Sequence, residues 1–91
     1  MADNLRNNVG HIPPSIVNFA NLAVLDLAFN NLEGPLPPIE QGQLPVLQFM
    51  WLESNYLDGT IPRSYRHMTN LKVLDLSYNE LEGPIPYEVP L

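Results

Sequence analysis

Hydrophobic and polar positions follow one repeating pattern along most of the chain. The pattern occurs three times, as LAVLDLAFNNLEGPLP from Leu22, LQFMWLESNYLDGTIP from Leu47 and LKVLDLSYNELEGPIP from Leu71. The starting positions lie 25 and then 24 residues apart, and Leu, Asn, Gly and Pro return at matching offsets. A period of this length is typical of proteins built from stacked repeats, each of which packs mainly on its neighbours.

The first half of each repeat alternates between apolar residues and residues of other kinds. The apolar pairs are Leu25 with Leu27, Met50 with Leu52, and Leu74 with Leu76. A period of two predicts a short strand with one buried face. We expect parallel strands at 24–26, 49–51 and 73–75, with the leucines forming one continuous core between the coils.

Polar and glycine positions mark where the chain leaves each strand. Asn30, Asn55 and Asn79 fall at this point, and we expect their side chains to turn inward and bond backbone groups of their own coil and the next. The later glycines permit a backbone conformation that a side chain would strain. They are Gly34, Gly59 and Gly83.

The second half of the repeat predicts short turns on the outer face. Ser15 and Ser64 each precede apolar residues spaced by three, which predicts single capped turns, partly 3₁₀, around 16–20 and 65–69. The middle repeat differs because it has one extra residue and carries Pro38, Gly42 and Pro45. We expect an irregular loop over 38–46.

The motif L-x-x-L-x-L-x-x-N-x-L-x-G-x-I-P resembles the plant-specific leucine-rich repeat. This repeat is found in the ectodomains of plant receptor kinases and receptor-like proteins, and in polygalacturonase-inhibiting proteins. The resemblance implies an α/β, right-handed leucine-rich-repeat solenoid, with a short parallel β-sheet on its concave face and helical or 3₁₀ turns and loops on its convex face. We expect a single domain over 1–91. Its parts are a degenerate repeat (5–21), two repeats (22–46 and 47–70) and a partial repeat (71–91).

Composition and charge narrow the classes of partner. Ten acidic against four basic residues give a net charge of −6, which disfavours nucleic acid. No apolar run approaches the roughly 20 residues that span a bilayer, so we expect no membrane insertion. The resemblance suggests an extracellular or cell-surface protein. The chain has no Cys caps, glycosylation sequon or leader pattern, which instead favours a cytoplasmic protein or a fragment.

Candidate catalytic and metal-binding groups do not assemble in the sequence. His11 and His67 lie in different repeats, and neither has a ligand partner at a suitable spacing. Glu80 and Glu82 flank a core leucine in the turn motif, as expected of solvated carboxylates rather than of a glycosidase acid pair. We therefore expect no enzyme, no cofactor and no metal site.

The outward-facing strand positions form a grid on the concave face, and its middle coil departs from the pattern of the others. There the sequence reads FMWLES, so we expect Phe49, Trp51 and Glu53 to anchor a partner with apolar and basic groups. The residues at the margin of this candidate site are Asp26, Phe29, Asp75 and Tyr78. A second interpretation stays open, in which the two aromatic residues only cover the neighbouring strands.

These features favour a non-catalytic module that recognises a protein or peptide, either receptor-like or inhibitor-like. One alternative is a structural or ice-binding solenoid, but an ice-binding face needs a regular array of small polar groups and the chain has only Thr60 and Thr69. Another alternative is a fragment of a larger receptor without a function of its own. We also expect self-association, because uncapped first and last coils leave strand edges open.

Overall fold

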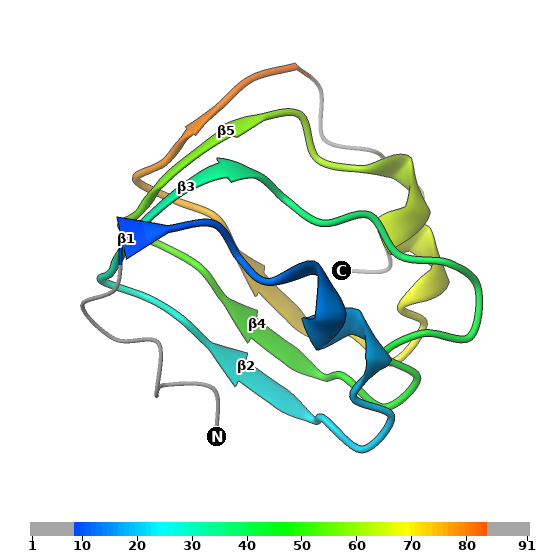
Figure 1. The fold of residues 1–91 in the computed structure, drawn as a ribbon. Coiled ribbons are helices and arrows are strands. Elements are labelled where there is room, and N and C mark those ends of the chain that lie inside the picture. Colours follow the sequence, from blue (N-terminus) through cyan, green and yellow to red (C-terminus); the bar gives the residue numbers. More distant parts are fainter. Residues whose placement is uncertain (1–8, 84–91) are drawn as a thin grey trace.

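The computed structural model describes residues 9–83, which wind into a stack of coils with a sheet on each of two sides (Figure 1). This is the expected right-handed leucine-rich-repeat solenoid. Its elements in chain order are β1 (Val9–Gly10), η2 (Pro14–Asn18), β2 (Val24–Asp26), β3 (Asn31–Pro35), β4 (Phe49–Trp51), β5 (Tyr56–Gly59), η3 (Arg63–His67), β6 (Val73–Asp75) and β7 (Glu80–Leu81).

The concave sheet has the order β2–β4–β6, and all its strands are parallel. The alternating pattern therefore predicts the three strands correctly. In the first two, the central residues Leu25 and Met50 face the core and are fully buried. The third central residue, Leu74, is only partly buried.

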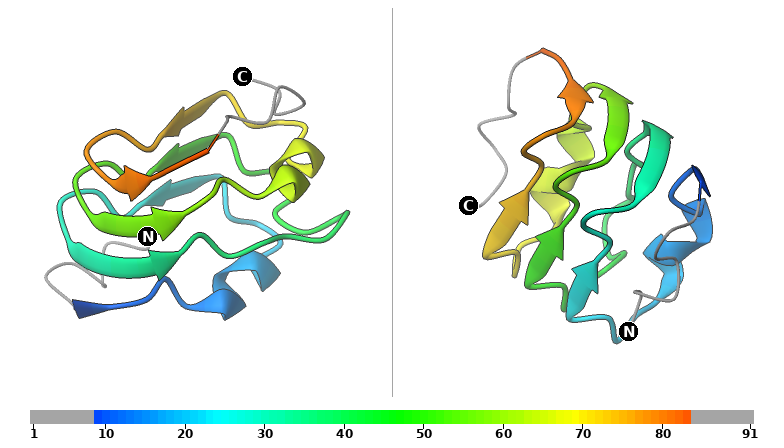
Figure 2. Two further views of the ribbon diagram at one scale, coloured as in Figure 1. Left: turned by 90° about the horizontal axis from the view of Figure 1, so that it is seen from above. Right: turned by 90° about the vertical axis from the view of Figure 1, so that its left-hand side faces the viewer.

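A second parallel sheet, of order β1–β3–β5–β7, lies on the other side of the coils, and the sequence interpretation missed it (Figure 2). Its strands are short, and three of the four (β1, β3 and β5) contain Gly, so their alternation is too brief to predict a strand. The ladder exists because stacking brings the same segment of successive coils side by side, with a register that places Gly34 opposite Leu57, two residues before its repeat equivalent Gly59. Gly34 and Gly59 have φ values of +84° and +80°, as expected of positions that strain a side chain.

The asparagines form the predicted interior ladder, but Asn55 and Asn79 bond the preceding coil rather than the next one. Asn55 accepts a hydrogen bond from the backbone N–H of Leu32 (3.1 Å) and donates to the carbonyl of Leu27 (3.0 Å), both in the preceding coil. Asn79 bonds Leu57 and Leu52 in the same way. The expectation of bonds to the next coil was wrong. The carbonyls that one coil leaves free at the end of its strand, Leu27 and Leu52, are bonded by the Asn of the following coil.

The convex turns are 3₁₀ helices, as predicted, but each begins two residues earlier than expected. Pro13 and Pro62 precede η2 and η3, and neither helix has a side-chain cap. The expected serine caps are therefore wrong, because proline already fixes the entering backbone. Ser64 has another role: its hydroxyl accepts a hydrogen bond from the N–H of Ile39 in the preceding coil (3.1 Å).

The segment 38–46 is irregular, as expected, and hydrogen bonds fix it within itself and to neighbouring coils. A turn closes between Glu40 and Gln43, whose side chain accepts from the N–H of Glu40 (2.7 Å) and donates to Asn18 (3.1 Å). Asn70 donates to the carbonyl of Pro45 (2.8 Å). These bonds connect the loop to the coils before and after it, so the extra residue is accommodated without loss of stacking.

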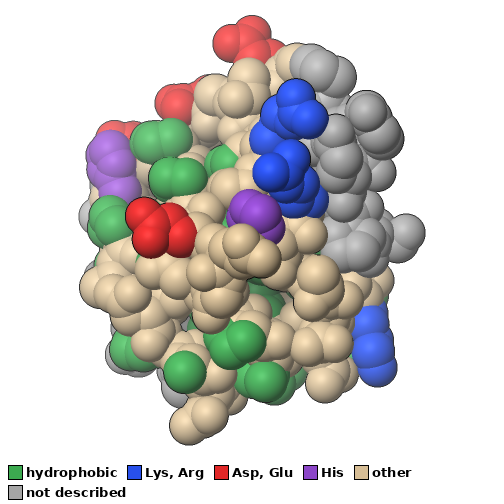
Figure 3. All heavy atoms as spheres, turned by 90° about the vertical axis from the view of Figure 1, so that its right-hand side faces the viewer, with side chains coloured by type: hydrophobic (Ala, Val, Ile, Leu, Met, Phe, Trp, Pro, Cys, Tyr) green, Lys and Arg blue, Asp and Glu red, His purple; other side chains and the backbone are tan. Residues whose placement is uncertain are grey.

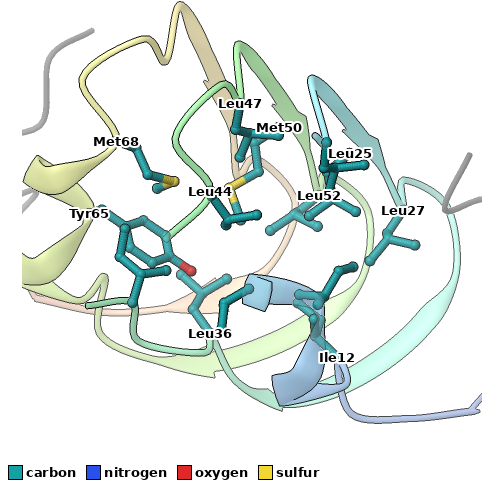
Figure 4. Packing of buried hydrophobic residues seen from close by; sticks show 14 of the residues in the cluster. Ile12, Leu25, Leu27, Leu36, Leu44, Leu47, Met50, Leu52, Tyr65 and Met68 are labelled. Atoms are coloured by element: carbon teal, nitrogen blue, oxygen red, sulfur yellow. The ribbon is translucent and has the colours of Figure 1, made fainter. Parts of the chain in front are cut away.

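One hydrophobic core runs through the coils between the two sheets and the convex turns (Figure 4). Tyr65 is its largest fully buried side chain, and its hydroxyl donates to the carbonyl of Pro37 (3.0 Å). Burial raises the pKa of this hydroxyl. Leu44 comes from the irregular loop and is also buried, at a positive φ of +48°. The loop therefore contributes to the core in place of the helical turn of the other coils.

The two ends of the stack differ. Leu25 and Leu27 in the first described strand coil are 0% exposed, whereas the equivalent Leu74 and Leu76 are only partly buried. The first coil, which was expected to be open, begins at residue 5, so part of this expectation lies outside the described residues; β2 and β6 are the edge strands of the described concave sheet. No helix among residues 9–83 is long and apolar enough to cross a membrane.

Candidate functional site: the concave face

The backbone register brings the predicted grid together on the exposed face of the β2–β4–β6 sheet. Phe49 lies opposite Val24 on one side and Val73 on the other. Trp51 lies in the same way between Asp26 and Asp75. Neighbouring strands in a sheet are about 4.8 Å apart, so residues in one row are within reach of a single partner side chain.

Phe49 and Trp51 stack on each other in the centre of this face. Their ring centroids are 5.4 Å apart and the ring planes are inclined by 17°. Both side chains are partly buried, while Met50 between them points into the core. The pair forms one continuous apolar surface along β4. Stacking limits the movement of both rings, so a partner that binds them immobilises few further torsions.

The two aspartates that flank Trp51 are partly occupied by local hydrogen bonds. Asp26 accepts a hydrogen bond from the N–H of Ala28 (3.2 Å). Asp75 accepts from both the hydroxyl (2.6 Å) and the N–H (3.1 Å) of Ser77. These two bonds hold the pKa of Asp75 below its ordinary value, and the bond from the Ser77 hydroxyl is the larger cause. Each carboxylate thus supports the turn after its strand, beside Trp51.

Glu53 differs from the residues at the same position of the neighbouring coils, Ala28 and Ser77. Its side chain is partly buried, and its Oε1 is shielded from solvent without a hydrogen-bond partner among the described residues. A shielded carboxylate oxygen without a donor is unfavourable, since it has lost hydration without replacement. A hydrogen-bond donor brought by a partner would remove this cost if the side chain turned toward it.

Phe29 and Tyr78 mark the margin of the face at the ends of the strands. Their side chains are 71% and 84% exposed, and both have positive φ, at 60° and 58°. Ser54, at the same position of the middle coil, shares this conformation with a φ of 63°. In each coil the residue with positive φ comes directly before the Asn whose side chain turns inward. The geometry of the ladder therefore directs two large aromatic side chains into solvent, one on each side of the middle coil.

All seven predicted site residues lie on or beside this face, at four repeat positions of three successive coils. The sequence marks Glu53 as a departure from the repeat pattern, but it does not show that one carboxylate oxygen of Glu53 is shielded, because shielding depends on the packing around it. The histidines lie elsewhere: the ring of His11 lies against the backbone of Gly34, and His67 ends η3. Among residues 9–83, no group of three or more His, Asp or Glu could hold a metal ion.

The convex side carries charge of the opposite sign. Arg63 and Arg66 are exposed on η3, and Lys72 is exposed just before β6. Figure 3, which views this side of the molecule, shows Lys or Arg side chains next to each other, with Asp or Glu side chains elsewhere in the same view. The acidic and aromatic groups of the concave face are thus on a different surface from the described basic residues of η3.

Comparisons with known proteins agree with this architecture. The family model described as Leucine Rich Repeat matches residues 21–42 and 70–90. Receptor-like protein 6 of Arabidopsis thaliana is 44% identical over 54 residues, which is 59% of this chain and 5% of that protein.

Solved structures of plant receptors match most of the chain. The crystal structure of the BIR3–SERK2 complex from Arabidopsis thaliana matches with a TM-score of 0.79 and 34% identity, over 88% of this chain and 43% of that one. The PEPR1–AtPEP1 structure has a TM-score of 0.83 and 31% identity, over 88% and 11%.

The ectodomain of the receptor kinase SOBIR1 from Arabidopsis thaliana has a TM-score of 0.81 and 30% identity, over 90% of this chain and 44% of that one. The chain therefore spans less than half the length of each of these relatives. Repeat pattern, sheet register and structural similarity lead to one conclusion: the chain is a leucine-rich-repeat solenoid similar to the ectodomains of plant receptors.

Proposed function

We propose that the chain is a non-catalytic recognition module that binds a protein or peptide on its concave face. The centre of the site is the Phe49–Trp51 stack together with Glu53, and the margin consists of Asp26, Phe29, Asp75 and Tyr78. The observation that carries the proposal is the stacked, partly exposed aromatic pair beside a shielded carboxylate oxygen that has no partner among the described residues.

The arrangement favours a partner with an apolar group next to a basic one. A large aromatic surface provides contact area with little loss of side-chain entropy. The carboxylates of Asp26, Glu53 and Asp75 surround this surface, so a Lys or Arg on the partner would be attracted to it and could donate to Glu53. Two exposed neighbours of Phe49, Val24 and Val73, extend the apolar surface across the sheet.

The similar proteins support a role in recognition. The matching structures include PEPR1 with AtPEP1 and BIR3 with SERK2, which are assemblies of the receptor with another molecule. By analogy we place this chain at the cell surface or outside the cell, as part of a receptor-like or inhibitor-like protein. The partner itself is to be identified by experiment.

A pull-down from plant extract tests the proposal, with three baits compared at equal folded concentration. We expect the unmodified chain to retain a partner that Trp51→Ala loses. Tyr56→Ala is a matched control, since Tyr56 is an exposed aromatic residue on the other sheet. Retention of the same partner by Trp51→Ala, with loss on Tyr56→Ala, would move the site to the β1–β3–β5–β7 sheet and contradict the proposal.

A further inference from the structure

Two large aromatic side chains flank a short one where the chain leaves the concave strands. Phe29, Ser54 and Tyr78 occupy the same position of three successive coils, and their φ values of 60°, 63° and 58° are nearly equal. Equal backbone conformation directs the three side chains the same way. Phe29 and Tyr78 are the most exposed large hydrophobic residues among residues 9–83, and between them the middle coil has only the small side chain of Ser54.

The pairing of the coils sets the distance between these side chains. The N–H of Phe29 donates to the carbonyl of Glu53 (3.0 Å), and the N–H of Ser54 donates to that of Ser77 (3.0 Å), so the three backbones stay paired here. Paired backbones lie about 4.8 Å apart, which puts a group above Ser54 about 4.8 Å from the coil of each ring. Attraction between a cation and an aromatic ring acts within about 6 Å of the ring centre. A cation above the middle coil is therefore within reach of both Phe29 and Tyr78.

Glu53 supplies a hydrogen-bond acceptor next to Ser54 in the chain. The neighbouring coils have Ala28 and Ser77 at this position, so the carboxylate is a feature of the middle coil. Its Oε1 is shielded from solvent and has no hydrogen-bond partner among the described residues. This oxygen has lost hydration without gaining a donor, and it favours a ligand that brings one. The aromatic pair and the carboxylate oxygen thus favour the same ligand: a cation that also donates hydrogen bonds.

We propose that Phe29, Glu53 and Tyr78 bind the guanidinium group of an arginine side chain on the partner. The inference rests on the proposed function and names the residue type by which a partner is anchored on the concave face. A guanidinium is planar and weakly hydrated, so its faces can lie against aromatic rings while the N–H groups at its edge donate to a carboxylate. A lysine ammonium is strongly hydrated and has no flat face, so it fits this arrangement less well.

Titration of the full chain with N-acetyl-arginine amide, followed by the backbone amide resonances in NMR, tests the arginine site. We expect shifts at Glu53 and Ser54 with a dissociation constant on the order of 1 mM, as suits one small isolated anchor. N-acetyl-citrulline amide has nearly the same shape without the charge and should bind about tenfold more weakly. N-acetyl-lysine amide should bind about threefold more weakly than the arginine compound.

Three variants assign the binding to the proposed residues. Glu53→Gln keeps the shape of the side chain and should weaken binding of the arginine amide about tenfold. Phe29→Ser and Tyr78→Ser introduce the residue that the middle coil already has at the same φ, so the fold is kept, and each should weaken binding about threefold. The matched controls are Glu33→Gln and Tyr56→Ser, an exposed carboxylate and an exposed ring paired in register on the other sheet, and both should leave binding unchanged.

Absence of shifts at Glu53 and Ser54, equal binding of the arginine amide and either of the other two amides, or unchanged binding to the Glu53 and aromatic variants would overturn the proposal. The pull-down distinguishes this failure from failure of the proposed function. A partner that is lost with Trp51→Ala, but retained by Glu53→Gln and by the Phe29→Ser, Tyr78→Ser double variant, would keep the concave face as the binding surface and exclude the arginine anchor.

Discussion

At the scale of the residue, Asn55 shows how one side chain connects two coils. Its carboxamide is buried and bonds backbone groups of its own coil and the preceding one, including the carbonyls of Leu27 and Leu52 at 3.0 and 3.1 Å. Two of these groups, the carbonyls of Leu27 and Leu52, come directly after β2 and β4, where the chain leaves the strand. The recurrence of Asn in the sequence predicts the ladder. It does not reveal the direction of the bonds, which depends on how far the coils are offset.

Replacing Asn55 with Ala should lower the free energy of unfolding by about 1–3 kcal/mol, since several buried backbone groups lose their partner at once. Asn79→Ala should cost less, because Asn79 is only partly buried in the last described coil. Asn31→Ala, at an exposed position of β3, is the control and should stay within about 0.5 kcal/mol. Urea unfolding measures all three. Equal costs for Asn55 and Asn31 would show that the ladder does not stabilise the stack.

At the scale of the element, the alternation of hydrophobic residues predicts β2, β4 and β6 within their observed bounds. The second sheet was missed because its strands have no local pattern of their own and arise only from stacking. The prediction that Ser15 and Ser64 cap the helical turns was wrong for a related reason. The serine pattern is local, but Ser64 bonds Ile39 of another coil, a contact that repeat spacing alone does not show.

Tyr65 connects η3 to the irregular loop, and its hydroxyl tests this connection. Tyr65→Phe removes the bond to Pro37 and leaves a buried carbonyl without a donor, so it should destabilise the fold by about 1–2 kcal/mol. Tyr56→Phe, at an exposed position, is the control and should change stability little. Thermal melts compare the two. An unchanged melting temperature for Tyr65→Phe would show that η3 and the loop are held by packing alone.

The buried hydroxyl also gives the fold an alkaline limit. The pKa of Tyr65 is raised in the folded chain by burial, so the folded state holds this proton more tightly than the unfolded state does. Stability from this group is complete below the ordinary tyrosine pKa near 10 and is lost as the pH rises above it. Stability therefore falls with rising pH, because the core favours the neutral form of the Tyr65 hydroxyl.

At the scale of the whole molecule, the stack presents two distinct surfaces: an acidic and aromatic concave face and a basic convex turn. The sequence predicts the concave grid, because equal repeat positions align in any such solenoid. It does not show that Leu25 and Leu27 are fully buried while Leu74 and Leu76 are only partly so, since burial depends on the packed structure. It also cannot show that Phe49 and Trp51 stack, which decides how much of each ring a partner can reach.

The central claim is that Trp51 serves binding more than folding. Trp51→Ala should lower the affinity for the retained partner by about 2 kcal/mol, roughly thirtyfold. It should cost the fold only about 0.5–1.5 kcal/mol, the value of an aromatic pair. Added salt should weaken binding of the unmodified chain, because Asp26 is exposed and its attraction for a basic partner is screened.

The most direct measurement is the affinity of Trp51→Ala per folded molecule, by titration calorimetry, alongside its free energy of unfolding. We predict that affinity falls about thirtyfold while most of the stability remains. A large loss of stability with unchanged affinity would contradict the account, since Trp51 would then only cover the neighbouring strands.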